Sequence, residues 1–463
     1  MPKTSRVSES AHEQAFPAAL RVFQELLRID TTNPPGNERA ACEYLGSILR
    51  EAGIPHEILE SAPGRANLVC RLQGDGTHEP VLLNAHLDVV PAEPELWTHP
   101  PFGGVIDQDC IWGRGALDMK HMAVMSLMTV LKIHRHGLPL KRDLIFAAVA
   151  DEEAGGEYGS GWLVNHHPEK IRAEYALGKI GGFSRTVDGR HFYPIQIAEK
   201  GICWLRIRAR GNPGHGSLPN WEGSVGKIGR AAFLLGRTRL PLHVTPEART
   251  FVERMAGHQS FPKGLILRQV LDRKWSRLIL ERVLPDRAMA RSLYAVLHNT
   301  ANPTIIRGGE KVNVLPSEAV LQVDGRILPG QSAADFLKEV TGVIGKDYEV
   351  EVIRYQPGVS VSPDDPILGD MAEILHEQDP GAIVIPYMAP GFTDATHFSR
   401  LGIRCFGFSP ARLPEKFNFV DLIHGHDERL PVEGFRFGLR ALCDLVSRIC
   451  VRETVPPPCS ATP

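Results

Sequence analysis

The chain has 463 residues, of which 43% are hydrophobic and 23% are charged. This length exceeds what one hydrophobic core usually serves, so we expect two or three domains. The formal net charge of -2 excludes a general electrostatic attraction to nucleic acid or to an anionic membrane. The amino terminus lacks the apolar core of a signal peptide, and no apolar stretch is long enough to span a bilayer. The sequence therefore predicts a cytoplasmic protein.

The first part of the chain alternates predicted helices with predicted strands. Apolar residues at helical spacing over 18–52 are interrupted by the turn-rich segment 30–37, which predicts two helices joined by a loop. The pattern further predicts strands at 67–72 and 81–85 and a helix at 118–136. Such alternation is typical of an α/β domain with a mainly parallel sheet and helices on both faces.

The stretch 144–153, LIFAAVADEE, joins a short apolar run to three consecutive acids. An apolar run of this length predicts a buried strand, and open α/β sheets carry their chemistry at the carboxyl ends of such strands. Asp151, Glu152 and Glu153 would repel one another there, and a bound cation would offset the repulsion. On this stretch alone, a solvated turn after the strand is an equally good interpretation.

The pattern changes after residue 199. Segments 202–210, 320–327 and 348–354 alternate apolar and polar residues, which predicts strands with one solvated face. Amphipathic helical stretches lie between them, at 224–235 and 265–298. Further along, the pattern predicts buried strands at 383–385 and 403–408 and a closing helix at 432–449.

These patterns predict one domain interrupted by another. The first domain would comprise 1–199 and 357–452, and an inserted α+β domain would occupy 200–356. The tail, 453–463, is rich in proline and is predicted to be disordered.

Histidines and acids recur where predicted strands end or a helix begins. The candidates are His86, Asp88, Asp118, Glu152, Glu153 and His424. Imidazole and carboxylate suit zinc, and a bridging carboxylate lets two divalent ions share one water. In the segment His86-Leu87-Asp88, Asp88 can accept the second N–H of the imidazole. Each histidine alone is more often structural, so it is the combined spacing that favours a metal site.

Eight motifs extend this pattern across nearly the whole chain. They are NAHLDVVP (84–91), WTHPPFGG (97–104), GRGALDMK (113–120), ADEEAGG (150–156), GNPGHGS (211–217), KVNVLPSEA (311–319), GFTDATHF (391–398) and HGHDER (424–429). With these motifs in this order, the sequence resembles the M20 family of metallopeptidases and aminoacylases. That family includes carboxypeptidases and enzymes like acetylornithine deacetylase and succinyl-diaminopimelate desuccinylase. The resemblance implies a di-zinc catalytic domain interrupted by a lid domain that often dimerises.

The resemblance also implies a role for each matching residue. His86 would bind one zinc, Asp118 would bridge both ions, and Glu153 with His424 would complete the other site. Glu152 would be the general base that accepts a proton from the attacking water. His215 would stabilise the oxyanion, and Arg326 with Asn313 would hold a substrate carboxylate. The alternative for Arg326 is an outward-facing strand residue without a function.

One family position departs from the pattern. The family's fifth ligand is an Asp or Glu in a segment resembling ALNEGG, whereas this chain reads ALGKIGG over 176–182, with Lys179 at the acid's place. A protonated lysine cannot ligate zinc, so we expect one well-formed site and a weak or empty second one beside His86. Glu174 could substitute for the missing acid if the loop were shifted.

The resulting prediction is a zinc-dependent hydrolase that cleaves an amide or peptide bond next to a free carboxylate. Its substrate would be an N-acyl amino acid or a short peptide, with no nucleic-acid or membrane partner and a homodimer formed through the lid. Two alternatives stay open. The chain could keep the pocket as a binding or scaffold protein without hydrolysis, or it could run a changed reaction such as acyl transfer, with Lys179 as acid, base or nucleophile.

Overall fold

The structure is a computed structural model that describes residues 9–284 and 287–452. The predicted disordered tail, 453–463, lies outside the described residues. The chain divides into two compact units, and it passes between them at four points, two of which lie within strands. The first unit comprises Met1–Ile195, Asp364–Val384 and Thr393–Pro463, and the second comprises Gln196–Pro363 and Ile385–Phe392. The domain limits predicted at 199/200 and 356/357 stay a prediction.

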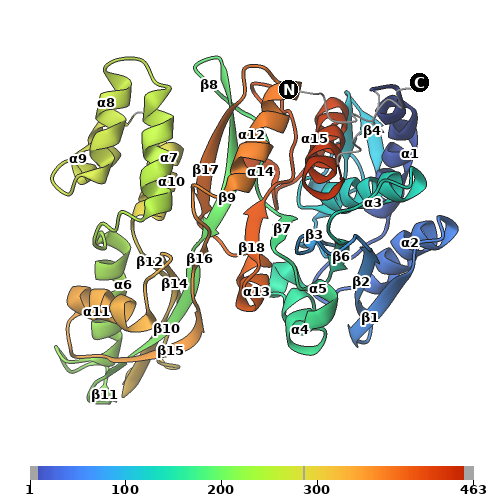
Figure 1. The fold of residues 1–463 in the computed structure, drawn as a ribbon. Helices are drawn as coiled ribbons and strands as arrows, with labels where there is room; N and C mark the ends of the chain where they lie inside the picture. Colours follow the sequence, from blue (N-terminus) through green and yellow to red (C-terminus); the bar gives the residue numbers. More distant parts are fainter. Residues whose placement is uncertain (1–8, 285–286, 453–463) are drawn as a thin grey trace, which may run out of the picture. The chain divides into compact units, whose positions relative to one another are not determined.

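Most strands of a ten-stranded sheet lie in the first unit (Figure 1). Its path runs through β1 (His56–Ala62), β2 (Arg65–Leu72), β6 (Leu144–Val149), β3 (Val81–His86), β7 (Tyr175–Gly178), β18 (Arg404–Gly407) and β9 (Arg190–Glu199), and β8 (Arg185–Val187), β16 (Val359–Ser360) and β17 (Ile383–Ala389) pair with β9. Strands β6, β3, β7 and β18 are parallel to one another, whereas β1 and β2 add an antiparallel edge. This is the predicted α/β sheet.

The register of the central strands decides where the site lies. Every residue of β3 and β6 is buried, as expected for parallel strands covered on both faces. His86, the last residue of β3, is paired with Val149, the last residue of β6. Because Leu83 of β3 is paired with Leu177 of β7, the carboxyl end of β7 also lies at this edge of the sheet. The segments that follow these three strands therefore converge.

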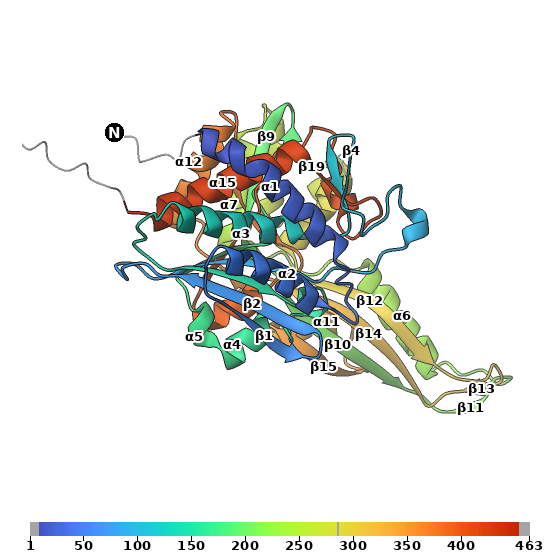
Figure 2. The same cartoon turned by 90° about the vertical axis from the view of Figure 1, so that its right-hand side faces the viewer.

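Helices cover both faces of this sheet, as Figure 2 shows. On one face, α4 and α5 contribute Leu163 and Ile171 to a core with Leu82 and Ile145 of the sheet. Helix α3 packs against β3 and β6 and is itself covered by α1 and α15. The helices of this unit are α1 (Glu9–Arg28), α2 (Glu38–Glu51), α3 (Lys120–Arg135), α4 (Ser160–His166), α5 (Pro168–Ile171), α12 (Pro366–Gln378), α13 (Ala395–Phe398), α14 (Phe419–Leu422) and α15 (Val432–Cys450).

A small three-stranded sheet adjoins the segment that leads into α3. It consists of β4 (Val105–Asp107), β5 (Cys110–Trp112) and β19 (Arg429–Pro431), with β5 in the middle. Arg429 is paired with Trp112, so the chain just before β19 lies beside the chain just after β5. This pairing brings the HGHDER segment to the segment that carries Asp118.

The second unit contains a four-stranded antiparallel sheet. Its order is β12 (Thr300–Gly308), β14 (Glu318–Ile327), β10 (Gly201–Arg210) and β15 (Glu349–Gln356). The strict alternation of buried and partly exposed residues along β14 matches the predicted strands with one solvated face. Helices α6 (Ser224–Arg237) and α11 (Ala333–Ile344) cover the buried face through Ile228 and Phe336. A two-stranded ladder, β11 (Gly214–His215) with β13 (Val314–Leu315), extends from this sheet.

The remaining helices of the second unit form their own core. They are α7 (Pro246–Gly257), α8 (Lys263–Arg268), α9 (Ser276–Leu278) and α10 (Arg287–Leu297). The helical stretch predicted at 265–298 is therefore broken into short helices, with a 3-10 turn and a π turn between them. Nothing in the described chain, 9–284 and 287–452, is a helix both long and apolar enough to cross a membrane.

Candidate functional site

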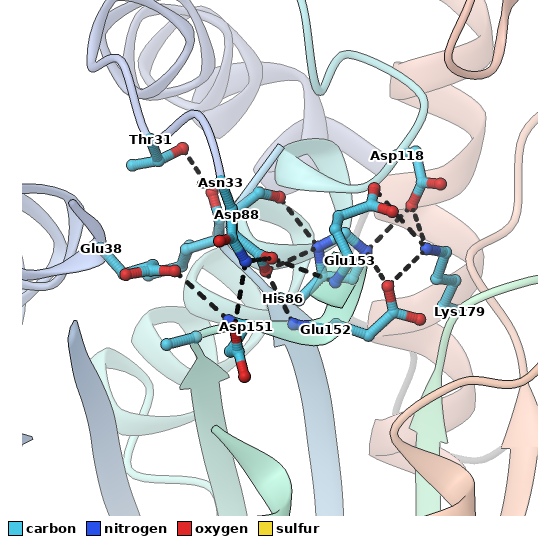
Figure 3. A network of polar contacts seen from close by, with 12 residues as sticks. Thr31, Asn33, Glu38, His86, Asp88, Asp118, Asp151, Glu152, Glu153 and Lys179 are labelled. Carbon is cyan, nitrogen blue, oxygen red and sulfur yellow. Dashed lines mark hydrogen bonds and ion pairs between the residues drawn. The ribbon is translucent and has the colours of Figure 1, made fainter. Parts of the chain in front are cut away.

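Six of the predicted site residues meet at the carboxyl edge of the parallel sheet. Figure 3 labels all of them except His424. His86 ends β3, Glu152 and Glu153 lie in a short 3-10 turn after β6, and Lys179 follows β7. Asp118 lies just before α3, and His424 lies between α14 and β19. The six side chains thus come from five different segments of the chain, with Glu152 and Glu153 sharing one of them.

The turn after β6 depends on Asp151. Its φ of 68° lies in the left-handed region, which Asp tolerates better than most residues and which reverses the chain directly after the strand. The Asp151 carboxylate accepts hydrogen bonds from Arg65 at 2.8 Å, from Asn33 at 3.1 Å and from the backbone N–H of Tyr158 at 3.1 Å. These bonds fix the turn, so Glu152 and Glu153 emerge from a rigid support.

Histidine and carboxylate ligand atoms converge as a metal site requires. One ligand atom from each of His86, Asp118 and Glu153 lies within 4.8 Å of the others. Nε2 of His424 lies 3.1 Å from Oε1 of Glu153 and 3.4 Å from Oδ2 of Asp118. Nε2 of His86 lies 2.9 Å from Oδ1 of Asp118. Asp118 therefore faces one histidine with each of its two oxygens.

Asp88 supports the site differently from the prediction. Nδ1 of His86 donates to the backbone carbonyl of Asp88 at 3.0 Å, and the Asp88 carboxylate lies further off, at 3.5 Å. That carboxylate instead accepts the backbone N–H groups of Glu152 and Glu153, each at 3.0 Å, and the amide of Asn33 at 2.9 Å. Burial raises the pKa of Asp88, but the nearby His86 imidazole, together with the hydrogen bonds from Asn33 and from the backbone N–H of Glu153, lowers the pKa below its ordinary value.

Lys179 points into the cluster (Figure 3). Its Nζ lies 2.9 Å from Oδ1 of Asp118, 2.8 Å from Oε2 of Glu152 and 4.0 Å from Oε1 of Glu153. Burial lowers the pKa of Lys179, but the carboxylates of Asp118 and Glu152 raise it well above its ordinary value. The amine is therefore an ammonium, which has neither a lone pair for a metal nor nucleophilic character.

Glu152 has one engaged oxygen and one without a partner. Oε2 accepts from Lys179 and lies 3.5 Å from Nε2 of His86, whereas Oε1 is buried and has no hydrogen-bond partner among the described residues. Burial raises the pKa of Glu152 above its ordinary value, although the charges of Lys179 and His86 act to lower it. A carboxylate with a raised pKa and a vacant lone pair is suited to accept a proton near neutral pH.

Glu428 supports the site, and the sequence pattern did not predict it. Its buried carboxylate accepts the backbone N–H groups of Gly115, Leu117 and Asp118 at 3.0, 2.7 and 3.0 Å, and a bond from Arg114 at 2.8 Å. Glu428 lies in the same HGHDER motif as His424. One loop thus carries His424 and also holds the backbone of Asp118. The only sequence signal was an acid within a motif already singled out for its histidine.

In the second unit, His215 and Asn313 lie in neighbouring loops. His215 of β11 is paired with Val314 of β13, and the carbonyl of Asn313 accepts the N–H of Gly216 at 2.9 Å. The backbone N–H of Ser217 donates to Nδ1 of His215 at 3.2 Å. A neutral imidazole that accepts at Nδ1 carries its proton on Nε2, so Nε2 is available as a hydrogen-bond donor.

Arg326 lies on β14 and already has a carboxylate partner. Its Nε donates to Oδ1 of Asp324 at 2.8 Å, and Nη2 donates to Oδ2 at 3.3 Å. The guanidinium carbon also lies 5.9 Å from the ring centre of Phe392. Nη1 has no hydrogen-bond acceptor among the described residues. Arg326 is therefore neither a simple outward-facing residue nor an unpaired cation. The sequence pattern did not predict its ion pair with Asp324.

The cluster offers ligand atoms for a divalent ion, one each from His86, Asp118 and Glu153. The imidazole of His424 can also combine with the carboxylates of Asp118 and Glu153 around one ion. A second ion beside His86 would need Oδ1 of Asp118 and a further acid. That oxygen is already contacted by both His86 and Lys179. Imidazole and carboxylate groups gathered at the carboxyl edge of a parallel sheet are the arrangement expected of a metal-dependent hydrolase.

Comparison with known proteins agrees with this class. The model of peptidase family M20/M25/M40 matches residues 82–448. The N-fatty-acyl-amino acid synthase/hydrolase PM20D1 of Xenopus tropicalis is 31% identical over 88% of this chain and 78% of its own length. Aminoacylase-1 of Sus scrofa is 27% identical over 95% of this chain and 97% of its own length.

A solved structure shares the fold. The M20 family metallo-carboxypeptidase Sso-CP2 from Sulfolobus solfataricus superposes with a TM-score of 0.67 at 16% identity, covering 92% of this chain and 98% of that one. The chain therefore belongs to peptidase family M20/M25/M40. It is a hydrolase of the type that acts on amide and peptide bonds, in a family whose members typically use two metal ions.

Proposed function

We propose that the protein hydrolyses the amide bond of an N-acyl amino acid, or of a short peptide, that carries a free carboxylate. The observation that carries the proposal is the position of Glu152, whose unpartnered oxygen lies in the same buried cluster as Asp118 and Glu153. A proton acceptor next to metal ligands is the arrangement that water-dependent amide cleavage needs. The names of the relatives PM20D1 and aminoacylase-1 support an acylated amino acid as the substrate.

We assign the metal as one zinc ion held by Asp118, Glu153 and His424. The imidazole and carboxylate ligands of this set suit zinc. When bound, the ion lowers the pKa of a coordinated water from about 15.7 towards about 7, which makes hydroxide available at neutral pH. His86 lies where the resemblance implies a second ion. Its Nε2 contacts Oδ1 of Asp118 at 2.9 Å rather than a metal in this proposal.

The chain's own residues carry the protons of the reaction. Glu152 accepts a proton from the attacking water, whose oxygen forms a bond to the amide carbon while the carbonyl π electrons move to the carbonyl oxygen. The Nε2–H of His215 is assigned to donate to that oxyanion. When the electron pair returns and the C–N bond breaks, Glu152 gives its proton to the departing nitrogen, so the products are a free amine and a carboxylic acid.

Substrate orientation is assigned to Arg326 and Asn313. Arg326 offers Nη1 to the substrate carboxylate, while Asp324 holds the other side of the guanidinium in a fixed plane. Because Asp324 offsets part of the positive charge, this site would favour a carboxylate through geometry more than through net charge. The cytoplasmic location and association through the inserted domain stay predictions from the sequence.

The test is hydrolysis of paired substrates by the zinc-loaded full chain. We expect release of free amino acid from N-acetyl- and N-oleoyl-amino acids, and much slower release from the same compounds with the carboxylate amidated. Glu152→Gln should lower the rate by about 10²–10⁴-fold, the usual contribution of a general base. Binding of these compounds without turnover by the wild-type chain would replace the proposal with the alternative of a binding protein.

A changed reaction through Lys179 is the second alternative. Acyl transfer with Lys179 as nucleophile needs a neutral amine, and the two carboxylates that contact it keep it protonated. A covalent acyl group on Lys179, found by mass spectrometry after incubation with substrate, would favour acyl transfer over direct hydrolysis.

A further inference from the structure

We infer that the ammonium of Lys179 is a built-in replacement for the second metal ion of a dinuclear centre, so that each chain binds one ion. This inference rests on the proposed function only for the identity of the metal site. It does not depend on which substrate the protein hydrolyses. Four observations within the first unit support it.

The position of Lys179 is fixed by the sheet. It follows β7 directly, and the backbone N–H of Phe408 donates to the carbonyl of Gly178 at 2.8 Å. The side chain is 9% exposed and reaches from the end of β7 to acids that belong to two other elements. A lysine on a solvated loop usually keeps its charged end in water, because its long side chain can reach the solvent. The Lys179 side chain points to the acids instead.

The ammonium uses the atoms that a second ion would need. Nζ lies within hydrogen-bond distance of Oδ1 of Asp118, and the same oxygen lies 2.9 Å from Nε2 of His86. An ion beside His86 would have to bind this oxygen and be close to Nζ at the same time. Repulsion between the ion and the ammonium at such a distance, in a buried site, opposes that arrangement.

The formal charge of the site is nonetheless unchanged. In the family pattern, a second divalent ion and its acidic ligand together contribute a single positive charge. The Lys179 ammonium contributes the same single charge, with no ion and no acid. The carboxylates of Asp118, Glu152 and Glu153 therefore face the same net positive charge as in a dinuclear centre. This balance explains how all three acids can be present although the acidic ligand of the second ion is absent.

The replacement also positions the proton acceptor. Lys179 donates to Oε2 of Glu152 at 2.8 Å, which leaves Oε1 without a partner among the described residues. An ammonium has three protons, and its contacts with Asp118 and Glu152 use two of them. Lys179 is thus a positioning residue that fixes which oxygen of Glu152 is available.

The test is the number of ions bound per chain. The full-length wild type and the variants Lys179→Glu and Lys179→Met are loaded with excess zinc and dialysed, and their metal content is measured by mass spectrometry. We expect one zinc per chain in the wild type and two in Lys179→Glu, because that variant restores the acid. Lys179→Met should stay at one, because removal of the ammonium alone supplies no ligand.

A matched control is Lys200→Met, which removes another buried lysine. Lys200 lies in the second unit and donates to the carbonyls of Ala295 and His298. This variant should keep one zinc. Far-ultraviolet circular dichroism and a cobalt titration, followed by the visible absorption of the bound ion, verify that each variant is folded and that its ions occupy protein sites.

Two tightly bound ions in the wild type would overturn the inference, as would a Lys179→Glu variant that is folded and still binds one. Neither result depends on activity. A wild type with one ion and no amide hydrolysis would keep the inference and remove the proposed function. A wild type that binds two ions and hydrolyses the substrates would overturn the inference and the assignment of a single zinc, and would keep the proposed reaction.

Discussion

The carboxylate of Glu428 accepts the backbone N–H of Asp118 at 3.0 Å, although 310 residues separate the two in the sequence. It also accepts the N–H groups of Gly115 and Leu117, so it organises the whole loop before α3. Asp118 is the residue that reaches both histidines of the cluster. The geometry of the metal site therefore depends on a residue that does not touch the metal position.

We predict that Glu428→Gln weakens zinc binding by about 10–100-fold, the usual cost of losing an outer-shell partner. A glutamine keeps the shape but replaces one acceptor oxygen by a donor, which faces backbone N–H groups that also donate. Competition with a chelator measures the affinity. Glu433→Gln, an exposed residue paired with Arg436 on α15, is the control and should change nothing. A loss of thermal stability in Glu428→Gln with no change in zinc affinity would mean that Glu428 has a structural role alone.

The two histidines should differ in their effect on the ion. If Asp118, Glu153 and His424 hold it, His424→Ala removes a direct ligand and should cost more affinity than the loss of an outer-shell partner. His86→Ala should cost about 10–100-fold, because His86 orients Asp118 through a 2.9 Å contact. The measurement is zinc affinity by competition titration. Equal and complete loss of zinc in both variants would make His86 a direct ligand of the single ion.

Arg326 should affect substrate affinity, and the effect should depend on the free carboxylate of the substrate. We expect Arg326→Met to raise KM for N-acyl amino acids by about 10–150-fold, the equivalent of losing a charged hydrogen bond worth roughly 1.5–3 kcal/mol. The slow hydrolysis of carboxylate-amidated substrates should be unaffected. Steady-state kinetics on both substrate types provides the comparison. A loss of the same size on both would assign Arg326 to structure, through its pair with Asp324.

Lys200 should make stability depend on pH above neutrality. Burial lowers the pKa of Lys200 to about 7 in the folded protein, whereas an unfolded lysine titrates near 10.4. Between these values the unfolded chain binds more protons, so stability rises with pH by up to about 1.4 kcal/mol per pH unit.

The measurement for Lys200 is thermal unfolding between pH 7 and pH 10. The wild type should gain stability relative to Lys200→Met as the pH rises from 7 to 10. Lys170→Met, which removes a surface lysine paired with Glu57, is the control and should show no such trend relative to the wild type. Parallel curves for the wild type and Lys200→Met would contradict the prediction.

The elements around the site could be predicted because their patterns are local. The apolar run of β6 and the acids after it stand next to each other in the sequence, and the structure places the run in the sheet and the acids at its edge. Strand ends that are far apart in sequence also converge as expected, because parallel strands bring their carboxyl ends to one edge.

Other features could not be predicted because they depend on contacts between distant residues. Glu428 and Asp324 act on groups that no periodic pattern connects to them. The stretch 265–298 keeps a helical pattern of apolar residues, yet the chain breaks it into short helices around one core. The expectation of a single metal ion rests on the identity of residue 179, and the contacts of its Nζ connect that identity to Asp118 and Glu152.

The most direct test of the central claim is an anomalous diffraction map recorded at the zinc edge from crystals of the zinc-loaded wild-type protein. We predict one peak per chain, among Asp118, Glu153 and His424, with the Lys179 amine between Asp118 and Glu152. A second peak beside His86, with the Lys179 side chain turned away from it, would contradict the account.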